Sequence, residues 1–150
     1  MAWTASGLYY LTFRDLLDTS GLVLNLDLET HKVALYTNTE TPNFSTETAY
    51  AATNEVTSAN WPAGGVALAG TTVSESPTGS LMWDATDVSV ASTTLVSVRG
   101  CKIYADALTT PTADALIVGV NFGADYSTSN GTFAITWATA GIFAIDLTPG

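Results

Sequence analysis

The first segment of the chain spaces its apolar residues as an amphipathic helix does. The residues that form this stripe are Leu8, Leu11, Leu16 and Leu17. Ser6 precedes the stripe as a candidate N-cap, and Gly21 follows it where a helix would end. We therefore predict one helix over about residues 6–20, packed against a sheet.

From residue 22 onward apolar and polar positions alternate, which is typical of strands. Residues 22–28 alternate strictly, and "HKVALYT" (His31–Thr37) is a second candidate strand. After Gly65 the candidate strands follow one another with short breaks: "VALAG", "TTVSES", "SLMWDA", "DVSVAS", "TLVSVRGCKIYAD", "DALIVGVNFG" and "TFAITWATAGIFAIDL". We predict a turn at Pro77-Thr78-Gly79 and a hairpin in the last run, folding back at Ala140-Gly141.

This succession of short strands predicts the fold class. We expect a mostly β protein, an antiparallel β-sandwich or flattened barrel of roughly seven to nine strands with one N-terminal helix. "DALIVGVNFG" is apolar on both faces and should be a central strand. Because no repeat or linker divides the chain, we expect a single domain over residues 1–150.

Residues 38–65 interrupt the pattern with a long stretch that has no sustained period and many turn formers. Such a stretch is usually a functional or interface loop, or it hides a short helix, which we place at 48–53. Its end, "NWPAGG", could be a ligand clamp or a structural corner. We interpret it as a corner that needs positive φ at Gly64, Gly65 or both. Trp61 would then anchor this corner onto the sandwich or onto a neighbouring subunit.

Charge limits the possible partners. Fourteen acidic residues face four basic ones, which gives a net charge of −10. The four cations are Arg14, Lys32, Arg99 and Lys102, and they are scattered along the chain. Nucleic-acid binding needs clustered cations, so we expect no nucleic-acid partner and rather a basic protein partner. No apolar run is long enough to cross a bilayer and the first residues do not resemble a signal peptide, so we expect no membrane association.

Residues for catalysis are few. His31 is the single histidine; it stands at a strand edge, where we expect it to be solvated, and no Gly-x-Ser-x-Gly motif accompanies it. Cys101 lies in an apolar run and should be a buried, inert thiol. Asp84 and Asp87 are close together in "WDATD", but a catalytic pair must flank a cleft, so we expect them to cap their own turn. We therefore expect no enzyme activity.

Metal and sugar sites are only weakly indicated. One histidine and one cysteine cannot form a zinc site, and the oxygen-bearing residues around Asp27 and Asp125 do not match a calcium loop. We therefore expect no cofactor or metal. Tryptophans could form a platform for sugar rings, but Trp83 and Trp137 lie on alternating strand-like runs and should be core residues. Trp61 is the one that lies in a loop.

The order of motifs carries a further indication. In sequence they are "LYYLTFRDLLD", "LDLETHKVALYT", "NEVTSANWPAGGVAL", "LMWDATDVSVAS", "VRGCKIYAD" and "ALIVGVNFGADYSTSNGTFAITWATAGIFAI". This order, over nearly the whole chain, resembles a family of small tailed-bacteriophage virion structural proteins from the capsid decoration and head–tail region. Its most specific parts are the corner at 54–65, the strand at 99–104 and the ending at 122–143. The chain departs from the family in its rigid Trp61-Pro62 pair.

The resemblance implies a non-enzymatic structural role without catalytic or metal residues. The first function class is a capsid decoration (cement) protein that binds the major capsid protein on the outside of the head and is located in the virion. Copies would form a homo-oligomer, for which a trimer is one arrangement. The alternative is a tail or head–tail connector component, or a small host-recognition module that binds cell-surface glycan.

The long irregular stretch is the predicted contact with the partner. Like charges oppose self-association and DNA binding at low salt, so attachment should rely on apolar and main-chain contacts. Aromatic residues on loops tend to be interface anchors. We therefore predict that Phe44, Tyr50 and Trp61 form the partner interface.

Overall fold

The structure is a computed structural model and describes residues 3–28, 30–75 and 79–148. It is a mostly β, sandwich-like fold with one short helix, which confirms the predicted fold class. The elements in chain order are β1 (Gly7–Leu8), α1 (Tyr10–Leu17), β2 (His31–Thr37), β3 (Glu55–Val56), β4 (Val66–Ala67), β5 (Thr72–Glu75), β6 (Ser80–Asp84), β7 (Val88–Thr93), β8 (Val98–Ala105), β9 (Ala115–Tyr126), β10 (Gly131–Ile135) and β11 (Phe143–Asp146).

One large antiparallel sheet has the strand order β1-β9-β8-β2-β3, and β4 also pairs with β2. Its central strands are buried on both faces, because successive side chains of a strand point to opposite sides. On β2, Val33 and Leu35 face one hydrophobic core, whereas Ala34 and Tyr36 face a second, smaller one. The prediction that the "DALIVGVNFG" strand is central is confirmed, since β9 lies between β1 and β8.

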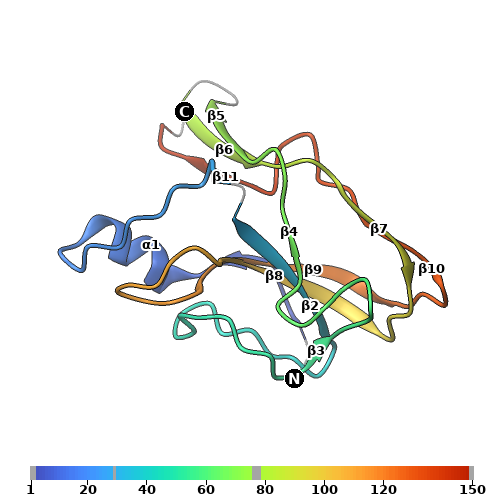
Figure 1. The fold of residues 1–150 in the computed structure, drawn as a ribbon. Helices are drawn as coiled ribbons and strands as arrows, with labels where there is room; N and C mark the ends of the chain where they lie inside the picture. Colours follow the sequence, from blue (N-terminus) through green and yellow to red (C-terminus); the bar gives the residue numbers. More distant parts are fainter. Residues whose placement is uncertain (1–2, 29, 76–78, 149–150) are drawn as a thin grey trace.

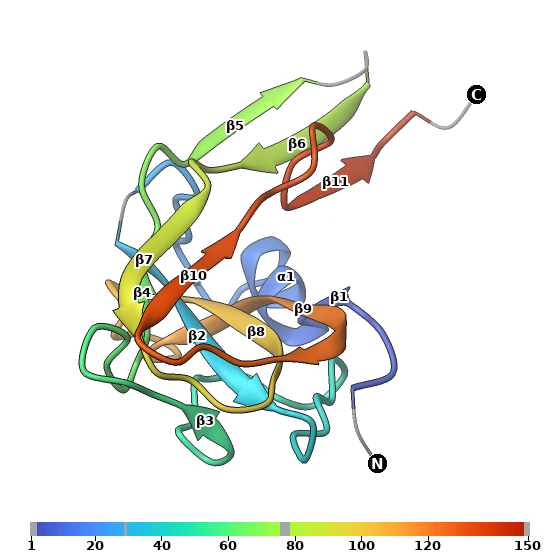
Figure 2. The ribbon, with the colours of Figure 1, turned by 90° about the vertical axis from the view of Figure 1, so that its right-hand side faces the viewer.

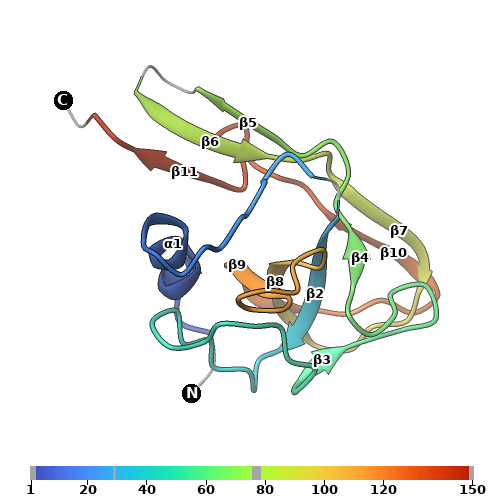
Figure 3. The ribbon, with the colours of Figure 1, turned by 60° about the vertical axis from the view of Figure 1, so that its left-hand side comes forward.

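Two smaller antiparallel sheets, β10-β7 and β11-β6-β5, cover the first face. In Figures 1 and 3 the three-stranded sheet lies opposite the large sheet, and the β7–β10 pair lies along one side. The helix α1 lies at the other side, where the Phe13 ring meets the Phe143 ring edge-on at 5.9 Å. The Thr12 hydroxyl of α1 donates a hydrogen bond to the Leu116 carbonyl of β9. The helix therefore closes the open side of a flattened barrel.

The helix is shorter than the leucine spacing predicted. It covers Tyr10–Leu17, and the N-cap position is Tyr9 rather than Ser6. The backbone of Gly7 and Leu8 forms β1 and pairs with β9, so these residues cannot adopt helical geometry. The Ser6 hydroxyl instead accepts a hydrogen bond from the backbone N–H of Asn121. Pairing to the sheet overrides the local helical signal.

The predicted strand at 22–28 is wrong. Its alternation does correspond to burial, because Leu22 is buried and Val23 is 76% exposed. The segment does not pair with any strand of the described chain, however. Isolated hydrogen bonds hold it beside the sheet β11-β6-β5. The Asp27 carboxylate accepts a hydrogen bond from the Val73 N–H, and the Leu26 carbonyl accepts one from the Trp83 indole.

Two further local predictions are wrong. The C-terminal run turns at Ala138–Gly141, but β10 pairs with β7 and β11 pairs with β6, so the two strands form no hairpin together. The predicted helical turn at 48–53 is extended instead, with a bridge between Ala49 and Ala115. Of the predicted turn at 77–79, Pro77 and Thr78 lie outside the described residues. Within the described ranges no helix is long and apolar enough to cross a membrane.

The backbone at Gly65 provides a stability test of the corner. Gly65 has φ +81°, and a Cβ there would overlap the Val33 carbonyl, whereas Gly21 has φ +78° in open space. We expect Gly65→Ala to lower the free energy of unfolding by at least about 3 kcal/mol, because strain and overlap add. The control Gly21→Ala carries strain alone and should cost about 1–2 kcal/mol. Urea unfolding measures both; equal losses would show that the close approach to Val33 is not restrictive.

Candidate functional site

The first part of residues 38–65 folds back over the second face of the large sheet (Figure 1), and the later part packs into the main core. Phe44 packs against Tyr9 with ring centroids 5.1 Å apart, and Tyr50 stacks on Tyr104 at 4.6 Å. Trp61 is 0% exposed and meets Phe133 edge-on at 5.6 Å in the main core. The three predicted interface residues thus all pack inward, although Phe44 and Tyr50 remain half-buried. Their contact with a partner stays a prediction for these two, whereas Trp61 has no surface to offer one.

The corner at the end of this stretch has the backbone that the sequence predicted. Gly64 and Gly65 both have positive φ, +84° and +81°. The Tyr104 hydroxyl donates a hydrogen bond to the Gly64 carbonyl at 2.7 Å, and the Gly64 N–H donates one to the Glu55 carboxylate at 2.9 Å. Trp61 anchors the corner onto the sandwich of its own chain, which is one of the two anchorages that the sequence predicted.

A buried ion cluster holds the same stretch down. The Lys102 ammonium of β8 lies 2.6 Å from Glu40 and 2.9 Å from Glu47, and all but a few per cent of the lysine is buried. The ammonium also lies 5.0 Å from the centroid of the Tyr36 ring. The other Glu40 oxygen accepts a hydrogen bond from the Asn54 side chain at 2.9 Å. One strand lysine thus binds two carboxylates of the loop, in a place where an unpaired charge would be costly.

Tyrosines surround this cluster. Burial is the largest cause that raises the pKa values of Tyr9, Tyr36 and Tyr104, so these phenols remain neutral. Burial, together with the Glu55 carboxylate, raises the pKa of Tyr50 to about 12. The Tyr50 hydroxyl donates a hydrogen bond to Glu55 at 2.7 Å. The charged groups of this arrangement are engaged by partners within the chain, which suits fixing a loop better than binding a reactant.

Sequence reasoning missed this cluster. A signal existed in "GCKIY", where Lys102 stands inside a strand that is apolar on both faces. A lysine at such a position needs buried carboxylates nearby. Its partners could not be identified from spacing, because Glu40 and Glu47 lie 62 and 55 residues away along the chain.

The structure also shows where the residues considered for catalysis lie and what they contact. His31 is 2% exposed, so the prediction that it is solvated is wrong. Its ring meets Trp83 edge-on at 5.5 Å, its Nε2 lies 3.0 Å from the Asn25 carbonyl, and burial lowers its pKa. Cys101 is buried as predicted, and burial raises the pKa of its thiol to about 12. The Asp87 carboxylate accepts a hydrogen bond from the Trp137 N–H, not from its own turn.

The candidate calcium residues are engaged within the fold. Asp125 pairs with Arg99 at 2.6 Å, and Asp27 binds the Val73 N–H at 2.7 Å. No group of three histidine, cysteine, aspartate or glutamate side chains in the described ranges could hold a metal ion. Trp83 is a core residue as predicted, and Trp137 packs partly buried against the core.

Every basic side chain of the chain is paired with a carboxylate. Besides Lys102 and Arg99, Arg14 binds Asp15, and Lys32 lies 3.0 Å from Asp106. The cations are therefore neutralised within the fold. The excess carboxylates are left without a cation of their own chain.

Lys102 permits a direct test of the ion cluster. We expect Lys102→Met to lower the free energy of unfolding by about 3–5 kcal/mol, because Glu40 and Glu47 lose their buried partner. Lys32→Met is the matched control, since its pair with Asp106 is about one-third exposed and should contribute less than about 1 kcal/mol. Urea unfolding provides both values. Adding Glu40→Gln and Glu47→Gln to Lys102→Met should restore part of the lost free energy of unfolding. If nothing is restored, the loss does not come from the unpaired carboxylates of the cluster.

His31 predicts how stability depends on pH. The folded chain holds His31 with a lowered pKa, so below about pH 6.5 the unfolded chain binds a proton that the folded chain does not. Stability from this residue is therefore present at neutral pH and is lost as the pH falls. We expect the free energy of unfolding of the wild type to drop more steeply than that of His31→Phe between about pH 7 and pH 5. Parallel curves over this range would contradict the prediction.

The chain matches no protein-family model, no curated protein and no solved structure. The resemblance of its motif order to tailed-bacteriophage virion proteins therefore stays a prediction.

Proposed function

We propose that this chain is a non-enzymatic structural protein of a bacteriophage virion that decorates the outer surface of the head by binding the major capsid protein. The observation that carries the proposal is that the apolar face of the sheet β11-β6-β5 extends beyond the residues that pack into the core. On β11-β6-β5, Trp83 and Phe143 pack into the core. The strand register places Val73 on the same face, directly opposite Trp83 on the outer strand β5, and it places Leu81 and Ile145 on this face two residues further along.

Val73, Leu81 and Ile145, here called the overhang, are incompletely covered by the part of the chain that the structure describes. Leu81 is 44% exposed and Val73 is 40% exposed, and Ile145 is half-buried. Figure 2 shows the ends of β5, β6 and β11 extending beyond the other strands. Exposed apolar surface of this kind is typical of a protein–protein contact.

The charges around the overhang favour a partner other than a second copy of this chain in solution. Glu75 and Asp146 are exposed beside the overhang, and the four basic side chains are already paired elsewhere. A second copy would bring the same carboxylates, whereas a partner with basic groups around an apolar patch would complement both features. The proposed homo-oligomer would accordingly assemble on the capsid lattice, where the partner supplies the missing cations.

The copy number in purified virions tests the proposed location. A decoration protein should approach the copy number of the major capsid protein, measured by quantitative gel densitometry or mass spectrometry of purified particles. Far fewer copies would contradict head decoration and favour the tail or the head–tail connector.

Substitutions in the overhang test the contact itself. Leu81→Asp should reduce binding of the added protein to undecorated particles at least about tenfold, because a charge enters the apolar contact. Val96→Asp adds the same charge at a residue that is 66% exposed outside the overhang, and should bind as the wild type does. Equal binding of the two folded variants would show that the overhang is not the contact.

A further inference from the structure

A hollow of about 490 Å³ opens between the outer half of β9 and the strand β10. Phe122, Tyr126, Ser127 and Thr128 line one side, and residues 132–136 line the other. Successive side chains of a strand point to opposite faces, so five consecutive lining residues mean that the hollow runs along the edge of β10. That edge is open, since β10 pairs only with β7 among the described strands.

The base of the hollow is aromatic. The Phe122 ring lies 6.4 Å from Phe133 and meets Tyr126 edge-on at 6.3 Å. Phe133 is buried and rests on Trp61, so the base is part of the packed core. Tyr126 is 49% exposed and presents its ring at the opening.

Hydroxyl groups surround these rings. The Thr128 hydroxyl is used within the fold, by Thr93 and by the Leu95 N–H. The Ser127 hydroxyl accepts a hydrogen bond from the Ser97 N–H and keeps its own proton for donation. Thr132 and Thr136 are exposed, and their hydroxyls have no hydrogen-bond partner in the described part of the chain.

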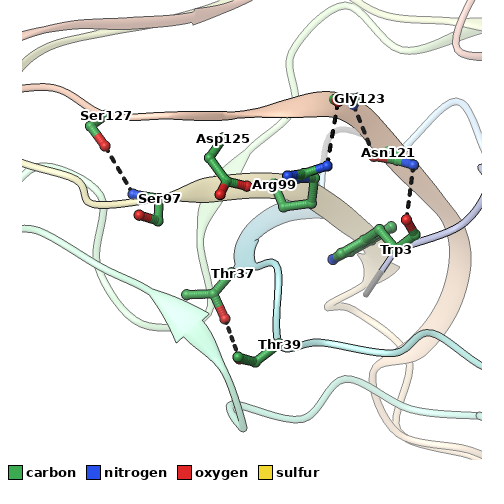
Figure 4. Close-up of polar contacts among 9 residues, drawn as sticks. All are labelled: Trp3, Thr37, Thr39, Ser97, Arg99, Asn121, Gly123, Asp125 and Ser127. Carbon is green, nitrogen blue, oxygen red and sulfur yellow. Dashed lines mark hydrogen bonds and ion pairs between the residues drawn. The ribbon is translucent and has the colours of Figure 1, made fainter. Parts of the chain in front are cut away.

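The β9 side of the hollow is fixed by polar contacts (Figure 4). Residues 122–125 of β9 bulge opposite the single β8 residue Arg99, because the register runs from Gly100↔Asn121 to Val98↔Tyr126. The Arg99 guanidinium holds the bulge through Asp125 at 2.6 Å and through the Gly123 carbonyl at 3.3 Å. The Gly123 N–H donates to the Asn121 side chain at 2.9 Å. The ring of Tyr126 is therefore carried on a backbone that is already ordered before any ligand binds.

We propose that this hollow binds a neutral carbohydrate. A sugar ring has C–H faces that pack on aromatic rings and hydroxyls that exchange hydrogen bonds with serine and threonine, which are the two chemistries of this lining. None of the lining residues is charged, and the net charge of −10 repels anionic sugars and phosphates. The site lies on strands other than those of the overhang, so it goes beyond the proposed attachment to the capsid.

An extended peptide is the competing occupant, because it could add to the open edge of β10. Such a peptide would bind mainly through main-chain groups and would depend little on the Tyr126 ring. The combination of an exposed ring with unused hydroxyls favours the sugar.

The test is an NMR titration of the isotope-labelled full chain with a panel of neutral trisaccharides of glucose, galactose, mannose and N-acetylglucosamine. We expect at least one trisaccharide to shift the amide signals of residues 122–128 and 132–136 at millimolar concentration. Tyr126→Ala should weaken this binding at least about tenfold, since the stacking surface is lost. Tyr10→Ala removes a tyrosine of α1 that is 59% exposed, somewhat more than Tyr126, and should leave the affinity unchanged.

A second variant separates loss of the ring from loss of the hydroxyls. Thr136→Val keeps the shape of the residue but removes its hydroxyl, and should also weaken binding while the unbound spectrum stays that of a folded chain. No shift with any trisaccharide of the panel would overturn the proposal. Binding that survives both Tyr126→Ala and Thr136→Val, or that occurs only with an extended peptide, would overturn it equally. None of these outcomes depends on whether the chain binds capsids.

Discussion

The large sheet is apolar on both faces, and the remaining elements are arranged to keep water away from one face or the other. The small sheets and α1 cover the first face. The second face contains Tyr36, Tyr104 and the charged Lys102, so a covering layer must supply carboxylates as well as rings. Residues 38–65 meet that requirement with Glu40 and Glu47, and these ion pairs hold in place a stretch that has little regular secondary structure.

The same pairing shapes the outer surface. Because each of the four cations is engaged by a carboxylate of its own chain, the excess negative charge is left without a compensating basic group outside. Any stable contact with another protein must then combine apolar area with cations from the partner. The overhang at Leu81 offers apolar area of this kind, with exposed carboxylates beside it.

The covering layers end before the strands do, and both proposed binding surfaces lie at such ends. The three-stranded sheet continues past Trp83 and Phe143 to Leu81 and Ile145, and Val73 lies on its outer strand. On the other side, β9 leaves its register with β8 at the Arg99 bulge and turns the rings of Phe122 and Tyr126 toward the open edge of β10. Buried packing thus holds the strands in place, and the uncovered strand ends form the two proposed binding surfaces.

The sequence by itself determined the features that depend on neighbouring residues. The apolar pattern identified β2 and, through a run that is apolar on both faces, the central β9. The glycine pair at 64–65 identified the corner, because strand patterning and positive φ are local properties. Only the tertiary structure decided which strands pair and which side chains are covered. Residues 22–28 pair with no strand of the described chain, because alternation does not specify a partner strand. His31 is buried, because the segments that pack over it come from elsewhere in the chain. The tertiary structure also joined Lys102 to carboxylates far away in the chain, and such contacts are set by the folding of the whole sheet and loop rather than by spacing.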